Sequence, residues 1–195
     1  VVGLKAAVAV DACCSIESAQ SDGIVELGSG VCVHADGKIL TAAHVAPVIG
    51  NFQIIAFADG IAHWARCVDV CEKWDLALLD VMTSNVDPPV IGRRRSSKKQ
   101  RRAAKARLSL PFVELSSTPP TPKDKLVCVG QPGRPRGERL EVSEGRVASV
   151  SDAPLSAQDH IEDDGGLVHT CPAFAGNSGS ALLAASGQLV GVHTG

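Results

Sequence analysis

Apolar residues along this chain gather into short runs that Gly, Asp or Pro residues separate. Runs of this length, rich in Val, Ile and Leu and bounded by turn residues, are typical of β-strands. Helical periodicity extends over ten or more residues nowhere except in one basic segment, so the pattern predicts an all-β fold, either a sandwich or a set of barrels. The expected strands cover residues 6–10, 23–27, 30–34, 38–42, 52–57, 76–81, 125–130, 146–150, 181–185 and 188–193.

Two segments in the middle of the chain interrupt this pattern. Residues 91–108 are polar and cationic, and residues 116–125 are rich in Pro and Ser. Together they predict a long exposed excursion between strands.

The charge of the chain is distributed unevenly. Its 19 Lys and Arg residues against 21 Asp and Glu give a formal net charge of −2, but nine of the basic residues lie between Arg93 and Arg107, where there is no acid. Such a run contacts polyanions such as nucleic acid, serves as a nuclear-localisation address, or is a solvated insertion that folds back on the acidic remainder. All three interpretations stay open, although the run has no aromatic residue for stacking on bases.

Composition excludes several classes of protein. With 45% hydrophobic and 21% charged residues the chain is globular rather than disordered. No uncharged apolar stretch approaches the roughly 20 residues of a membrane-spanning helix, and nothing near Val1 has the pattern of a signal peptide. We expect no membrane span.

The seven cysteines are odd in number and lie mostly in apolar runs, which predicts buried free thiols. This usage favours an intracellular location, and the basic run leaves a nuclear one open. Cys67 and Cys71 have the C-x3-C spacing of a zinc ligand pair, but no second pair at comparable spacing follows, so the zinc interpretation is the weaker one. We expect no metal and no organic cofactor.

Three segments carry residue types that suit acyl transfer. His44 follows a predicted buried hairpin, Asp75 begins an apolar strand, and Ser178 lies between Gly176 and Gly179. Acyl transfer needs a hydroxyl nucleophile, an imidazole base, a carboxylate that fixes the imidazole tautomer, and backbone donors for the oxyanion. Glycine permits the positive φ that turns loop amides into one concavity. The order His, Asp, Ser is that of chymotrypsin-like barrels, not of subtilisins or α/β-hydrolases.

On these segments the sequence resembles the trypsin-like serine peptidases, and within them the HtrA/DegP-like and glutamyl-endopeptidase branches. The matching segments are residues 28–45, 65–81, 128–150 and 169–195. The resemblance implies a chymotrypsin-like double β-barrel of two six-stranded Greek-key barrels and a polypeptide substrate. We therefore divide the chain into a first barrel at 1–90, an excursion at 91–125 and a second barrel at 126–195.

The resemblance also implies a role for each residue of the site. His44 is the general base, Asp75 orients it, and Ser178 is the nucleophile. Asp69 and Asp80 compete with Asp75 but lie in the preceding strand and at the far end of its own. The amides expected to form the oxyanion hole are those of Gly176, Asn177 and Ser178.

One departure concerns activation. Val1 to Gly3 superficially resemble the new amino terminus of an activated trypsin, but Asn177 stands where the partner Asp of that switch would be. Relatives with an intact triad but no activity exist. The rival function is therefore a silent scaffold that binds nucleic acid or a protein through the basic run.

Specificity is expected to depend on the residues around the nucleophile. Pro172, Ala173 and Phe174 replace the acidic floor of a trypsin pocket, which argues against preference for Lys or Arg. His193 and Thr194 lie in a segment that resembles the pocket histidine segment of glutamyl endopeptidases. We therefore expect Glu, Asp or Gln before the scissile bond, against the HtrA-like alternative of a small aliphatic residue.

The chain as given stops at Gly195, directly after a strand expected in the pocket wall. We expect either a truncated carboxyl end, a partner that supplies the missing edge, or an incomplete pocket. An exposed edge strand there would pair with a substrate strand or with another copy, so an oligomer is also expected.

Overall fold

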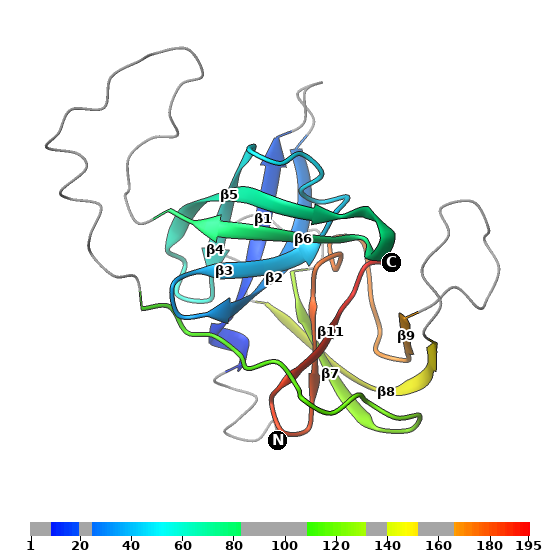
Figure 1. Cartoon of the computed structure of the whole chain (residues 1–195). Coiled ribbons are helices and arrows are strands. Elements are labelled where there is room, and N and C mark those ends of the chain that lie inside the picture. Colours follow the sequence, from blue (N-terminus) through cyan, green and yellow to red (C-terminus); the bar gives the residue numbers. More distant parts are fainter. Residues whose placement is uncertain (1–8, 20–24, 83–108, 132–139, 152–165) are drawn as a thin grey trace, which may run out of the picture.

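The computed structural model describes residues 9–19, 25–82, 109–131, 140–151 and 166–195, and these residues are nearly all in strands, turns and extended connections (Figure 1). The all-β prediction is confirmed. The elements are β1 (Cys13–Ala19), β2 (Val25–His34), β3 (Lys38–Ala42), β4 (Phe52–Phe57), β5 (Ala62–Cys71), the 3-10 turn η1 (Glu72–Trp74), β6 (Leu76–Val81), β7 (Lys125–Gly130), β8 (Glu141–Ser151), β9 (Gly166–His169), β10 (Ala181–Ala184) and β11 (Leu189–Val192).

The first six strands form a closed antiparallel barrel in the order β1-β2-β3-β6-β5-β4. In β6 the residues Ala77, Leu79 and Val81 alternate inward, as period-2 patterning requires. Ile16, Ile39, Ile55 and Leu79 are among the largest fully buried side chains and come from four different strands. Closure leaves this barrel with no unpaired edge.

The other five strands form one sheet in the order β11-β10-β7-β8-β9. Among the described residues this sheet is open, with β11 and β9 as its edges, where the sequence analysis expected a six-stranded barrel. Val129 on β7 and Ala181 and Leu183 on β10 join the core of the first barrel. Residues from strands 7, 8 and 10 pack with Cys171 in a second cluster, so apolar side chains cover both faces of this sheet.

A strap at residues 109–116 runs across both units (Figure 1). The amide of Val113 donates to Cys32 O at 2.9 Å in the first barrel, and Ser116 N donates to Leu189 O at 2.8 Å in the second sheet. Residues 117–119 and 121–125 are exposed, as expected for the Pro-rich part of the excursion. The basic run from Arg93 to Arg107 lies outside the described residues.

The prediction of a strand at residues 6–10 is wrong for the two residues that the structure describes, because Ala9 and Val10 lie in a short helical turn. The strand begins three residues later, at Cys13, and buries Ser15 and Ser18 together with its apolar residues. Because these two serines are polar, the pattern of apolar residues does not indicate a strand here. Within the described part of the chain, no helix is long and apolar enough to cross a bilayer.

Truncating Leu79 to Ala should lower the free energy of unfolding by about 2–5 kcal/mol, because it opens a cavity in the closed barrel. The control is Val68→Ala on β5, where the side chain is 37% exposed and the loss should stay below about 1 kcal/mol. Denaturant unfolding of both variants measures the difference. Equal losses would contradict the assigned core.

Candidate active site

Asp75 holds His44 at two points. The Asp75 Oδ2 atom lies 2.7 Å from His44 Nδ1, and Oδ1 accepts from the His44 backbone N–H at 2.9 Å. Asp75 ends the turn η1 in the left-handed region with φ 47°, a conformation that Asp tolerates better than most residues. With Nδ1–H donated to the carboxylate, the lone pair of Nε2 is free to take up a proton.

The two competing carboxylates point elsewhere. Asp80 forms an ion pair with Lys38 Nζ at 2.9 Å. Asp69 accepts from the Val70 amide beside it. Only Asp75 of the three contacts His44.

Ser178 follows a tight turn from Phe174 to Asn177. The Asn177 amide donates to Phe174 O at 2.9 Å, and Gly176 has φ 94°, which together define a type II turn that needs Gly at its third position. The N–H groups of Gly176 and Ser178 bond to no described residue. Two of the three expected oxyanion donors therefore have no partner within the described ranges, while the Asn177 amide is engaged in the turn.

Ser29 on β2 connects this loop to both halves of the molecule. Its amide donates to Ser178 O at 2.7 Å, and its hydroxyl donates to Gly176 O at 3.0 Å. The same hydroxyl accepts from Gln131 N at 2.8 Å, and Ser29 O accepts from Thr41 Oγ1 at 2.7 Å. Ser29 is fully buried, so little water competes at its end of these four bonds, called here the Ser29 node.

Two glycines allow the close approach on which the Ser29 node depends. A Cβ atom at Gly28 would lie 2.7 Å from the Val45 side chain and 3.1 Å from Ser178 O. Gly179 has φ 89°, and a Cβ there would overlap Ser29 O. The turn after His44 therefore packs on Gly28 of β2, and the Ser178 loop packs on both Gly28 and Ser29.

The structure records no hydrogen bond between Ser178 Oγ and His44 in the part of the chain it describes. Such bonds are often long in the absence of substrate and tighten when it binds. His193 lies near both elements: its backbone pairs with Gly179 and Ser180 beside Ser178, and its pKa is lowered by burial first, then by His169 and His44.

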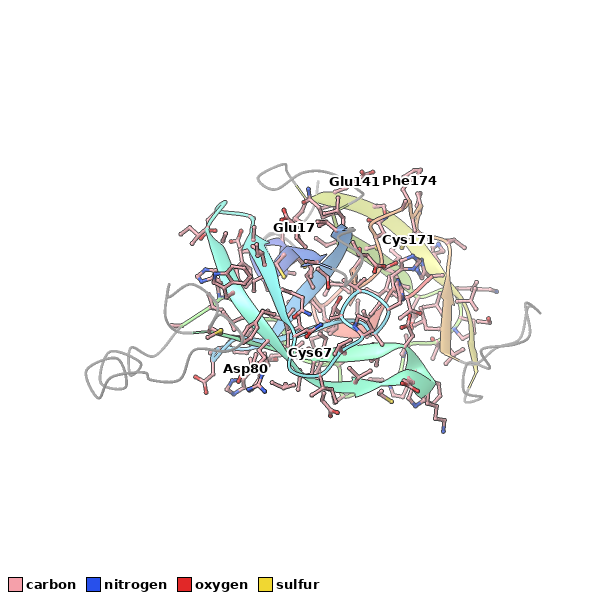
Figure 2. The ribbon with its side chains drawn as sticks, turned by 90° about the horizontal axis from the view of Figure 1, so that it is seen from above. Glu17, Cys67, Asp80, Glu141, Cys171 and Phe174 are labelled. Carbon is pink, nitrogen blue, oxygen red and sulfur yellow. The ribbon has the colours of Figure 1, made fainter. Side chains whose placement is uncertain are left out.

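A cavity of about 570 Å³ opens beside this loop, between the second sheet and the turn η1. His193 and Thr194, both expected in substrate binding, line it together with Ala173 and His169. Phe174 does not line this cavity; its side chain is 61% exposed and projects at the edge of the molecule (Figure 2).

His169 is the residue that sequence reasoning missed. Its Nε2 lies 3.0 Å from His193 Nδ1, with the two rings in a T-shaped arrangement. Burial lowers the pKa of His169, and burial followed by the charges of His169 and His44 lowers the pKa of His193. No sequence signal marked His169, because β9 is only four residues long and the pairing spans 24 positions.

All seven cysteines are free thiols and six are buried, as predicted; Cys71 is exposed. Burial, with a smaller contribution from Cys171, raises the pKa of Cys128 to about 11, which keeps it a thiol at neutral pH. Cys67 Sγ donates to the Ala46 carbonyl at 3.4 Å. No three His, Cys, Asp or Glu side chains of the described ranges are grouped so that they could hold a metal ion.

A closed barrel joined to a second sheet, a His–Asp pair and a serine in a glycine-rich turn define a chymotrypsin-like serine peptidase fold. The family model of the trypsin-like peptidase domain matches residues 28–192, so the chain belongs to this family. Serine protease HTR4 of Bos taurus is 29% identical over 170 residues, which cover 87% of this chain and 30% of that protein. The chain therefore spans about a third of the length of the curated relatives it matches.

Solved structures agree on the fold. The serine endoprotease from Yersinia pestis is 24% identical with a TM-score of 0.67, over 97% of this chain and 56% of that one. The HtrA-type protease AlgW with tripeptide is 23% identical with a TM-score of 0.69, over 96% of this chain and 52% of that one. The chain thus carries a trypsin-like peptidase domain, and the relatives and structures it is similar to include HtrA-type serine proteases.

Replacing Ser29 by Ala should lower the free energy of unfolding by about 1–3 kcal/mol, because Gly176 O and the Gln131 amide lose a buried partner. It should also slow any reaction at Ser178 by about tenfold or more, since the loop loses an anchor. Ser15→Ala is the control, because that buried hydroxyl bonds to Ala56 O in the first barrel. Equal effects of both variants on reactivity would contradict a special role for Ser29.

The free energy of unfolding should decrease as the pH is lowered, because of the pair formed by His169 and His193. Because the folded state lowers the pKa of His169 and His193 below the ordinary 6.5, the unfolded chain binds protons first as the pH falls. The free energy of unfolding should therefore decline from about pH 7 downward until the pair itself is protonated. Denaturant unfolding between pH 7.5 and 5 measures the slope, which the double variant His169→Gln, His193→Gln should reduce; an unchanged slope would contradict the assignment.

Proposed function

We propose that this domain is a serine endopeptidase whose catalytic residues are His44, Asp75 and Ser178. The observation that carries the proposal is a His44 imidazole held in one tautomer by Asp75, together with a serine loop whose Gly176 and Ser178 amides bond to no other described residue. An imidazole with a free Nε2 and two free amides are the groups that acyl transfer requires.

The reaction then follows from these groups. His44 Nε2 takes the proton of Ser178 Oγ as that oxygen forms a bond to the peptide carbonyl carbon. The carbonyl oxygen becomes an oxyanion and accepts from the Gly176 and Ser178 amides. His44 returns the proton to the leaving amine as the C–N bond breaks, which leaves an acyl-enzyme. Water, deprotonated by His44, attacks the ester and releases the second product and the free Ser178 hydroxyl.

The polypeptide substrate is proposed to present an oxygen acceptor to His193. The side chain before the scissile bond would be Gln, Glu or Asp, since a half-buried imidazole N–H in a cavity recognises a carboxamide or carboxylate oxygen. Selection of a small aliphatic residue is the alternative, and the apolar part of the same cavity, at Leu182 and Val190, is compatible with it.

A fluorophosphonate probe tests the nucleophile. The folded wild-type protein should be labelled at Ser178, and Ser178→Ala should abolish labelling. Asp75→Asn should lower kcat by about 10⁴-fold, because the amide stabilises the wrong imidazole tautomer, without loss of fold. Peptide mapping of the labelled protein by mass spectrometry, with turnover of a peptide library, measures both effects.

Absence of labelling in a folded sample would overturn the proposal. It would favour the rival function, a peptidase-like scaffold that binds a polyanion or protein through Arg93 to Arg107. Retention on heparin that decreases with salt, and is lost on deletion of that run, would support this rival.

A further inference from the structure

The two histidines beside the nucleophile form a chain of hydrogen bonds with a fixed direction. The chain begins at the Cys171 backbone N–H, which lies 3.2 Å from His169 Nδ1 and can only donate. His169 Nδ1 is therefore an acceptor, and the proton of the neutral ring is on Nε2. That Nε2–H donates to His193 Nδ1 at 3.0 Å, so the proton of the neutral His193 ring is on its own Nε2.

The last N–H group in this series of hydrogen bonds is His193 Nε2–H, which bonds to no described residue. His193 lines the cavity beside the Ser178 loop, and its backbone is fixed there on both sides. Its carbonyl accepts from Gly179 N at 2.7 Å, and its amide donates to Ser180 O at 2.9 Å. A donor of defined tautomer is thus held in the cavity beside the loop of the proposed nucleophile.

The same chain opposes a positive charge on His193. A second proton on His193 would place Nδ1–H against the Nε2–H of His169, two donors facing each other at 3.0 Å. His169 could relieve this clash of donors only by carrying its own proton on Nδ1. That proton would then face the Cys171 backbone N–H, which already donates to Nδ1. Among the described residues that line the cavity there is also no Lys or Arg. A carboxylate entering it would lose hydration without a cation to replace it.

We propose that His169 is a positioning residue that keeps His193 a neutral Nε2–H donor, and that this donor selects Gln over Glu or Asp before the scissile bond. The inference rests on the proposed peptidase function and narrows its substrate class to a carboxamide side chain. Gln offers a neutral oxygen acceptor, so it pairs with the N–H without the cost of burying a charge.

The first test is cleavage of four peptides that differ only in Gln, Glu, Ala or Leu before the scissile bond. For the wild type, kcat/KM should be at least about tenfold higher for Gln than for Glu. His169→Leu should lower kcat/KM for Gln by about tenfold and leave Ala and Leu within about twofold. His169→Gln, whose side-chain amide can still donate to His193 Nδ1, should recover most of the loss, and exposed His34→Leu is the control.

Two results would overturn the inference while leaving the peptidase proposal intact. One is a wild-type preference for Glu equal to or above that for Gln. The other is an equal loss for all four peptides in His169→Leu, which would indicate only a structural role.

A second measurement does not depend on catalysis. Nitrogen-15 NMR of the imidazole rings in Ser178→Ala at pH 7.5 should show both His169 and His193 as neutral Nε2–H tautomers. An Nδ1–H tautomer or an imidazolium at either residue would contradict the inference. The same variant should bind the Gln peptide more tightly than the Glu peptide. If Ser178→Ala binds the Gln peptide more tightly but the wild type does not cleave it, only the peptidase proposal is overturned. If Ser178→Ala binds the Gln and Glu peptides equally, the inference about Gln selection is overturned.

Discussion

The buried hydroxyl and backbone of Ser29 form the contact on which the rest of the site depends. One residue of β2 fixes Ser178 O and Gly176 O on one side and Gln131 and Thr41 on the other. The serine loop belongs to the second sheet, whereas the His–Asp pair belongs to the first barrel. Their relative position is therefore set by bonds that cross between the units and that meet at a fully buried residue.

Each half contributes a group held in an uncommon backbone state. Asp75 reaches His44 from a left-handed conformation at the end of η1, and Gly176 needs a positive φ for the type II turn. Such conformations persist where several surrounding bonds hold them. The two hydrogen bonds to His44 hold Asp75, and the bond from the Ser29 hydroxyl holds Gly176. The His44–Asp75 pair and the turn before Ser178 are thus formed before substrate arrives, which reduces the cost of ordering them in the transition state.

Local pattern and motif order predicted the all-β class, most strands and the contact of His44 with Asp75, because these depend on periodicity and on short segments. Other features depend on pairings distant in sequence. The first strand was missed since Ser15 and Ser18 are buried among apolar residues. The role of Ser29 and the pairing of His169 with His193 arise only when β2, β9 and the end of β11 come together. The hydrogen bond from the Asn177 amide to Phe174 O likewise could not be predicted, because it exists only once the turn has formed.

We propose that a serine loop anchored by Ser29 presents the Gly176 and Ser178 amides, which bond to no other described residue, to an oxyanion beside His44. The crystal structure of the fluorophosphonate adduct at Ser178 tests it directly. We expect the phosphoryl oxygen about 3 Å from the Gly176 and Ser178 amides, with Ser29 Oγ still bonded to Gly176 O. A phosphoryl oxygen directed away from these amides, or a reversed peptide at Gly176 that has left Ser29, would contradict it.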